Sequence, residues 1–149
     1  MSATGENAEM RCDLHSLIAD VALFAGDRVL LVRYKDVDKY DGETGWFLPD
    51  DGIRRLEPPD EAARRIVTEQ LGFTDARPRL AHVESFVGND GTWHLPLHYV
   101  VELDRAPRLR PSEDLGAAEW FDLTKLPPRS EVAHHGWALA TIRRIRGKA

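Results

Sequence analysis

Apolar and polar positions repeat along the chain with strand and helix periods, which together predict a mixed α/β domain. Mostly apolar, partly β-branched runs at residues 16–24 and 29–32 predict two strands, joined by a short hairpin turn at Ala25-Gly26-Asp27. The same reasoning predicts further strands at residues 79–87, 93–103 and 117–123. Residues 34–44, rich in Asp, Lys and Gly, are expected to form a loop, and Asp50-Asp51-Gly52 an acidic turn.

Two helices complete the predicted domain. The clearer one spans about residues 59–71, because a proline lies in its first turn, acidic residues follow at the positive end of its dipole, and Gly72 comes just after its end. Its apolar stripe is expected to face the core, while Arg65 and Glu69 share a solvated face. A second helix is expected at residues 130–146, with His134 and His135 on the surface.

Composition places the chain among globular proteins with small-molecule partners. With 149 residues, 42% hydrophobic and 30% charged, we expect one domain at residues 15–149 after a polar tail at residues 1–14. The net charge of −5 argues against binding to duplex nucleic acid or an anionic membrane. The single cysteine, Cys12, excludes an intrachain disulfide, and the chain shows no secretion signal or membrane span. A cytoplasmic protein is therefore expected, of unknown oligomeric state.

The segment from Trp46 to Phe73, WFLPDDGIRRLEPPDEAARRIVTEQLGF, resembles the signature of the Nudix superfamily. That signature reads G-x5-E-x7-R-E-U-x-E-E-x-G-U, where U is aliphatic. Aligned without gaps, six of its nine fixed positions fit this chain, and the departures are Asp51, Ile66 and Gln70. The resemblance implies a Nudix-like mixed β-sheet sandwiched between the helix of this box and a C-terminal helix.

The resemblance also implies a reaction and a set of site residues. In the family, carboxylates of the box helix hold Mg²⁺ or Mn²⁺, which bridges the diphosphate of a nucleoside-diphosphate-linked substrate and activates water. Two of those three carboxylates are replaced here, so the resemblance implies a weakened or divergent hydrolase. Its catalytic residues would be Glu69, Glu57 and Arg65, and its metal ligands Glu57, Glu69, Asp50 and Asp51. A purely structural role for each of these residues stays open.

A second candidate site lies on the predicted hairpin of residues 80–101. Apolar residues occupy its odd positions, and the even positions include His82, Glu84, His94 and His98. Twofold alternation places this polar set on the face opposite the core. A three-residue loop at residues 89–91, with Gly91 left-handed, would pair Val83 with Leu97 and His82 with His98. Two imidazoles and a carboxylate can bind Zn²⁺, Ni²⁺ or Fe²⁺, although a polar face without a ligand is the alternative.

Three functions therefore stay open. The chain is a divergent Mg²⁺- or Mn²⁺-dependent hydrolase, a non-catalytic Nudix-fold module that binds a nucleotide-like ligand and reports it to a partner, or a repurposed metalloenzyme that uses the His/Glu face. Aromatic rings that could stack on such a ligand belong to Tyr34, Tyr40, Trp46, Phe86 and Trp93, and packing is the alternative role for each.

Overall fold

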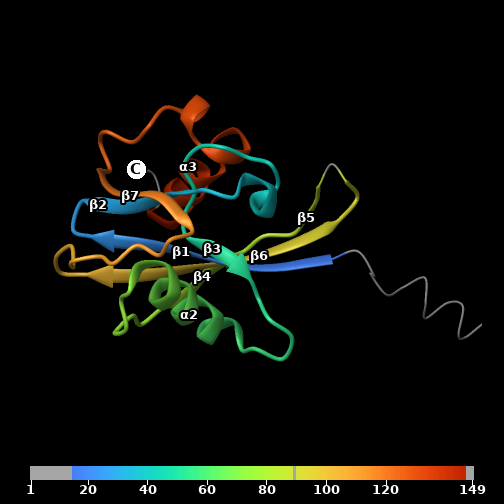
Figure 1. Cartoon of the computed structure of the whole chain (residues 1–149), viewed down its shortest axis with the longest axis horizontal. Helices are drawn as coiled ribbons and strands as arrows, with labels where there is room; N and C mark the ends of the chain where they lie inside the picture. The colour runs from blue at the N-terminus through green and yellow to red at the C-terminus, as the bar shows by residue number, and fades with distance from the viewer. Residues whose placement is uncertain (1–14, 89, 147–149) are drawn as a thin grey trace, which may run out of the picture.

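The computed structural model describes residues 15–88 and 90–146, so the tail predicted at residues 1–14 lies outside the described part of the chain. Within that part, seven strands form one mixed sheet (Figure 1). They are β1 (His15–Ala25), β2 (Arg28–Tyr34), β3 (Asp50–Gly52), β4 (Arg79–Val83), β5 (Phe86–Val87), β6 (Trp93–Leu103) and β7 (Leu115–Asp122). The helices are α2 (Pro59–Leu71) and α3 (Ala133–Arg146), with 3-10 turns η1 (Val37–Tyr40) and η2 (Arg129–Glu131).

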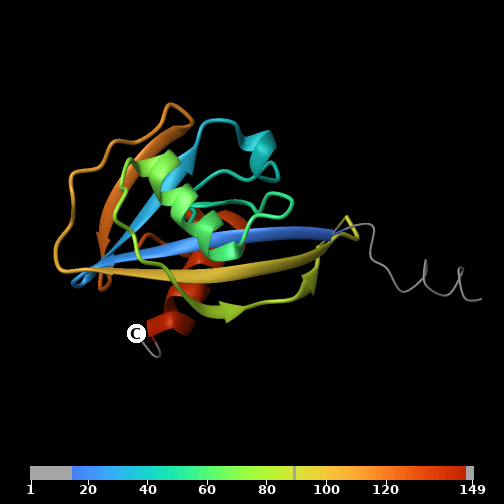
Figure 2. The ribbon, with the colours of Figure 1, turned by 90° about the horizontal axis from the view of Figure 1, so that it is seen from below.

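Strand β1 lies at the centre of the sheet, whose strand order is β4-β6-β1-β2-β7. It pairs in parallel with β6 along its whole length, and Figure 2 shows the two long strands side by side. On its other edge β1 pairs with β2 at Phe24↔Val29, which confirms the predicted hairpin, and with β3 at Asp20↔Asp50. The acidic turn predicted at residues 50–52 is therefore wrong, because the open edge of β1 recruits these residues as a strand.

Both faces of the sheet are covered, α2 lying below it and α3 above it in Figure 1. Odd positions of β1 and β6, such as Val21 and Tyr99, join a core that contains Ile66 of α2. Even positions, such as Ala22, join a second core that contains Ile142 of α3. The sheet sandwiched between the two helices is the predicted arrangement, and it explains why residues 19–25 are all buried.

Two predicted elements differ in their backbone. The expected loop at residues 34–44 contains the 3-10 turn η1. The C-terminal helix does not run regularly from residue 130, because His134, His135 and Gly136 all have positive φ values, of 53°, 56° and 86°. The surface prediction holds for His135, whereas His134 is only partly exposed and its Nε2 lies 3.2 Å from Asp41.

Gly45 provides a test of how the loop after η1 is held against η2. Its φ is 104°, and a Cβ built there would lie 2.7 Å from the Glu131 carbonyl oxygen, whereas a Cβ on Gly42, at φ 71°, would meet nothing within 4 Å. We expect Gly42→Ala to cost about 1 kcal/mol of unfolding free energy and Gly45→Ala at least about 1 kcal/mol more, because only the second adds a backbone clash. Chemical denaturation measures both, and equal losses would contradict the prediction.

Candidate functional site

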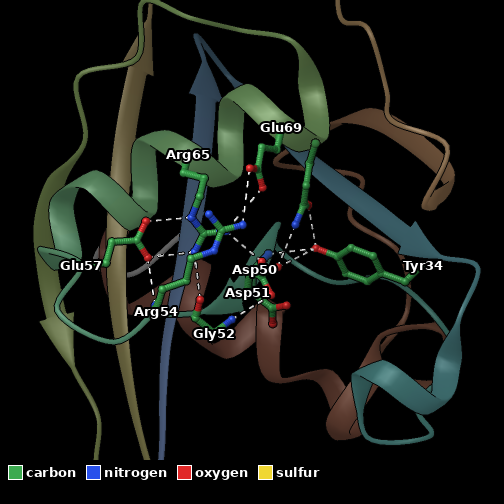
Figure 3. Close-up of polar contacts among 9 residues, drawn as sticks. Tyr34, Asp50, Asp51, Gly52, Arg54, Glu57, Arg65 and Glu69 are labelled. Atoms are coloured by element: carbon green, nitrogen blue, oxygen red, sulfur yellow. Dashed lines mark hydrogen bonds and ion pairs between the residues drawn. The ribbon is translucent and has the colours of Figure 1, made fainter.

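The guanidinium of Arg65, on α2, contacts the carboxylates of Glu57, Asp51 and Glu69 (Figure 3). Its Nε and Nη2 donate to both oxygens of Glu57, at 2.8 and 3.0 Å, and its Nη1 donates to Asp51 Oδ2 at 3.0 Å. Nη2 also donates to the Gly52 carbonyl oxygen at 2.9 Å, and the Arg65 side chain is only 11% exposed. Such a bidentate pair is strong and directional, so Arg65 fixes the loop between β3 and α2.

The carboxylates of Glu57 and Glu69 differ in how many hydrogen bonds they accept from the protein. Hydrogen bonds from Arg65 lower the pKa of Glu57 below its ordinary value, and Glu57 Oε1 also accepts from the backbone N–H of Arg54. Glu69 is 53% exposed, and its ion pairs with the described residues are long, 3.5 Å to Arg65 and 3.6 Å to Arg54. Glu57 is therefore committed to the loop, whereas Glu69 is available to a ligand.

The side chains of Ile66 and Gln70, also on α2, are both engaged by contacts within the protein. Ile66 is 1% exposed and packs in the core between the sheet and α2. The Gln70 amide donates through Nε2 to the Asp50 carbonyl oxygen at 2.8 Å, and its Oε1 accepts from the Tyr34 hydroxyl at 2.8 Å. Both ends of the Gln70 amide are thus satisfied inside the protein.

A small cavity of about 120 Å³ lies beside this network. Asp51 and Glu69 contribute carboxylates to its wall, and Lys39 and Arg54 contribute cations. No three His, Cys, Asp or Glu side chains of the described residues are arranged to hold a metal ion. Mg²⁺ is nevertheless commonly bound by one or two carboxylates together with water and substrate phosphates, and Asp51 and Glu69 fit that requirement.

The predicted His/Glu hairpin pairs in the expected register but lies in a different environment. Val83 pairs with Leu97 and His82 with His98, as predicted, and Gly91 is left-handed with φ 84°. The polar face is not solvent-exposed at its centre, however, because α3 covers it and His98 is 0% exposed. Alternation showed only that the two faces differ in polarity, and it could not show that a second helix would cover the polar one.

His98 is held between two carboxylates. Its Nδ1 lies 2.6 Å from Asp20 Oδ2 and its Nε2 lies 2.5 Å from Glu84 Oε1. An imidazolium donates from both nitrogens, so this geometry suits protonated His98. His82 only stacks on His98, with ring centroids 6.0 Å apart, and His94 stacks on Phe86 at 5.1 Å. A metal bound by His98 would have to displace one of its carboxylates.

Burial and neighbouring charges shift the pKa values of Asp20 and His98, which form a hydrogen-bonded line with Glu84. Burial raises the pKa of Asp20 from 3.8 to about 6, although its hydrogen bond to His98 acts in the opposite direction. Burial alone would lower the pKa of His98, but the hydrogen bonds and charges of Asp20 and Glu84 outweigh it and raise the pKa above 6.5. Sequence reasoning missed Asp20, although it is the one acidic residue inside the apolar run of residues 16–24.

The candidate stacking residues occupy different places. Trp46 is 5% exposed and packs edge-on against Phe121, so its ring is not available to a ligand. Tyr34 and Tyr40 stack on each other, with ring centroids 3.6 Å apart, beside the small cavity. Phe86 and Trp93 are partly exposed near the hairpin end, and Trp93 Nε1 donates to Ser85.

Comparison with known proteins identifies the family: the chain belongs to the Nudix family, whose domain matches residues 14–140. A MutT Nudix hydrolase from Burkholderia pseudomallei superposes with a TM-score of 0.73 at 22% identity, covering 88% of this chain and 98% of that one. The dihydroneopterin triphosphate pyrophosphohydrolase of E. coli gives a TM-score of 0.62 at 14% identity, with 87% and 97% coverage.

A third related structure contains ligands. It is a bifunctional NMN adenylyltransferase/ADP ribose pyrophosphatase from Francisella tularensis complexed with AMP and a manganese ion, with a TM-score of 0.64 at 14% identity, covering 95% of this chain and 44% of that one. A search of curated proteins finds no match. None of the helices in the described part of the chain is long and apolar enough to cross a membrane.

The buried Asp20–His98–Glu84 line predicts that the protein loses stability as pH rises. Between 3.8 and about 6 the folded chain keeps a proton on Asp20 that the unfolded chain has lost, and above 6.5 the same holds for His98. Because the folded state binds more protons, the unfolding free energy should fall by up to about 1.4 kcal/mol per pH unit for each group.

Denaturation between pH 4 and 8 measures this slope. The double variant Asp20→Asn/His98→Gln should flatten it, while His135→Asn on an exposed side chain should leave it unchanged. The other groups that face His98 are Glu84, His82 and Trp137, and none of them is altered in the double variant. An unchanged slope in the double variant would contradict the prediction.

Proposed function

We propose that this Nudix-family chain is a divergent pyrophosphohydrolase that acts on a nucleotide-like diphosphate at the small cavity beside α2. The observation that carries the proposal is the arrangement around Arg65. Asp51 and Glu69 both contact its Nη1, at 3.0 and 3.5 Å, and both line the cavity. The family expectation of a divalent cation and a nucleotide-like substrate agrees with this pair of carboxylates.

In this proposal, the residues around the small cavity bind the metal ion, position its ligands and orient the phosphate groups. Asp51 and Glu69 would hold Mg²⁺ or Mn²⁺, which when bound neutralises diphosphate charge and activates water. Arg65 positions both carboxylates and keeps Glu57 against the loop. Lys39 and Arg54, on the cavity wall, provide positive charge that orients phosphate oxygens.

Glu69→Gln tests this assignment directly. We expect it to lower Mg²⁺-dependent hydrolysis of nucleoside diphosphate compounds at least ~100-fold, as for loss of a major electrostatic group in an active site. Glu61→Gln is the matched control, because Glu61 is an exposed glutamate on the same helix that does not line the cavity. Phosphate release from a substrate panel measures the rates, and equal rates for the wild type and Glu69→Gln would rule out the assignment.

A second candidate, a Nudix-fold module that binds such a ligand without hydrolysing it, is favoured by Gln70. A glutamate at this position would bring two acceptor oxygens together at the Asp50 carbonyl, and a cation between them would be needed to relieve the repulsion. The Gln70 amide supplies a donor there instead, so the contact is stable without a metal.

Gln70→Glu distinguishes the two candidates. We expect the variant to be less stable than wild type without divalent ions, and to regain stability when Mg²⁺ is added, because binding to the folded state alone stabilises it. Gln70→Met loses the same hydrogen bonds without adding charge and should show no extra Mg²⁺ response. Thermal unfolding with and without Mg²⁺ measures this, and identical Mg²⁺ shifts in the two variants would contradict it. Activity gained only in Gln70→Glu would favour the module for the wild type.

A further inference from the structure

Two cations line the small cavity, and they differ in whether a carboxylate neutralises them. The guanidinium of Arg54 lies 3.6 Å from Glu69. Lys39 forms no ion pair with residues 15–88 or 90–146, and its ammonium lies over the ring of Tyr40, 5.9 Å from the ring centroid. A positive charge at a cavity wall that no carboxylate neutralises is available to an anionic ligand.

A third carboxylate of the cavity wall makes this cation necessary for an anion. Asp51 and Glu69 are the proposed metal ligands, and Asp114 also lines the cavity. A bound divalent ion offsets the charges of its own two ligands, which leaves the carboxylate of Asp114 to repel an incoming phosphate. The ammonium of Lys39 offsets that remaining charge.

The turn η1, which carries Lys39, has a fixed backbone. The Asp36 side chain accepts the backbone N–H of Lys39 at 3.4 Å, and the Gly42 N–H donates to the Val37 carbonyl oxygen at 2.7 Å. Asp41 ends the turn in the left-handed region, with φ 63°. These contacts place the backbone of Lys39 but do not orient its side chain, so the direction of the ammonium depends on the neighbouring ring.

The ring of Tyr40 connects this turn to the hydrogen-bond network of the site. It stacks on Tyr34, with centroids 3.6 Å apart and planes within 7°, and packs edge-on against Phe47 at 5.9 Å. The Tyr34 hydroxyl is itself fixed, because it donates to Gln70 Oε1 at 2.8 Å and accepts the Asp50 N–H at 2.9 Å. Tyr40 is therefore held in place beside the cavity that it lines.

We propose that Tyr40 is a positioning residue, which holds Lys39 at the wall of the small cavity so that its ammonium binds a phosphate group of the substrate. The inference rests on the proposed function, because it concerns the same cavity. An aromatic face attracts an ammonium group, and a lysine side chain that is restricted before binding loses less entropy when the phosphate arrives.

Calorimetric titration of the full-length protein with imidodiphosphate, in the presence of Mg²⁺, tests the role of Lys39. This diphosphate analogue has nitrogen in place of the bridging oxygen, so binding is measured without hydrolysis. We expect Lys39→Met to weaken binding ~10-fold, because a hydrogen bond from a charged donor contributes about one such step. Lys35→Met is the matched control, since Lys35 is an exposed lysine on the same loop that does not line the cavity.

Variants of Tyr40 test whether it acts through Lys39. Tyr40→Phe keeps the ring and should bind imidodiphosphate as tightly as the wild type, whereas Tyr40→Leu should weaken binding several-fold. The double variant Lys39→Met/Tyr40→Leu should bind no more weakly than Lys39→Met alone, because the ring has no effect once the ammonium is absent. A role for Tyr40 in packing alone would instead give additive losses.

Tyr40→Leu is expected to fold, because Tyr40 is only partly buried and no residue of η1 is fully buried. Tyr40→Met, which also removes the ring but keeps a long apolar side chain, repeats the measurement. Additive losses in the double variant, equal affinities for Lys39→Met and the wild type, or no binding to the wild type would each overturn the proposal.

The same variants separate this inference from the proposed hydrolysis. A wild type that binds imidodiphosphate with the expected pattern but does not release phosphate from any substrate would contradict the hydrolase and support the role of Tyr40. Hydrolysis that depends on Glu69, together with unchanged affinity in Lys39→Met, would support the hydrolase and overturn the role of Tyr40.

Discussion

Burial of strand β1 on both faces is the constraint on which the rest of this structure depends. Its odd positions pack under α2 and its even positions under α3, so a charged residue within it has no route to water. Asp20 is such a residue, and an unpaired buried charge costs several kcal/mol, a large share of a domain's net stability. The parallel pairing places His98 of β6 directly beside it. Glu84 then completes the line on the far side of the imidazole.

Strand β3 is fixed by its pairing with β1, and this pairing sets the positions of residues in the candidate site. Because it pairs with β1 through Asp20↔Asp50, its two aspartates are fixed on opposite sides of the sheet. Asp51 pairs with Arg65 beside the small cavity, whereas the side chain of Asp50 lies on the other side and its backbone groups hydrogen-bond with Tyr34 and Gln70. A short strand at this point therefore separates two chemically different environments, which a flexible acidic turn could not do.

Sequence patterns predicted the longer strands, the helix at residues 59–71 and the His82–His98 register, because each rests on local periodicity and on the parity of strand pairing. Strand β3 was not predicted, because it forms only where the edge of β1 is open to it. The burial of His98 could not be predicted, since it depends on where α3 packs. The left-handed backbone at His134 and His135 also had no local signal. It is held by tertiary contacts, in which Glu43 accepts the His134 N–H and Arg129 donates to the His135 carbonyl oxygen. The role of Gln70 was equally hidden, because it depends on a carbonyl group twenty residues earlier.

Ile66 and Gln70 of α2 are each consistent with the structure around them. Ile66 fills a core position, and the Gln70 amide donates one hydrogen bond and accepts another, so both side chains are fully accommodated by the fold. The fold alone therefore does not establish the chemistry of this chain. The chemistry has to be inferred from the site itself, where the wall of the small cavity combines the carboxylates of Asp51 and Glu69 with the cations of Lys39 and Arg54.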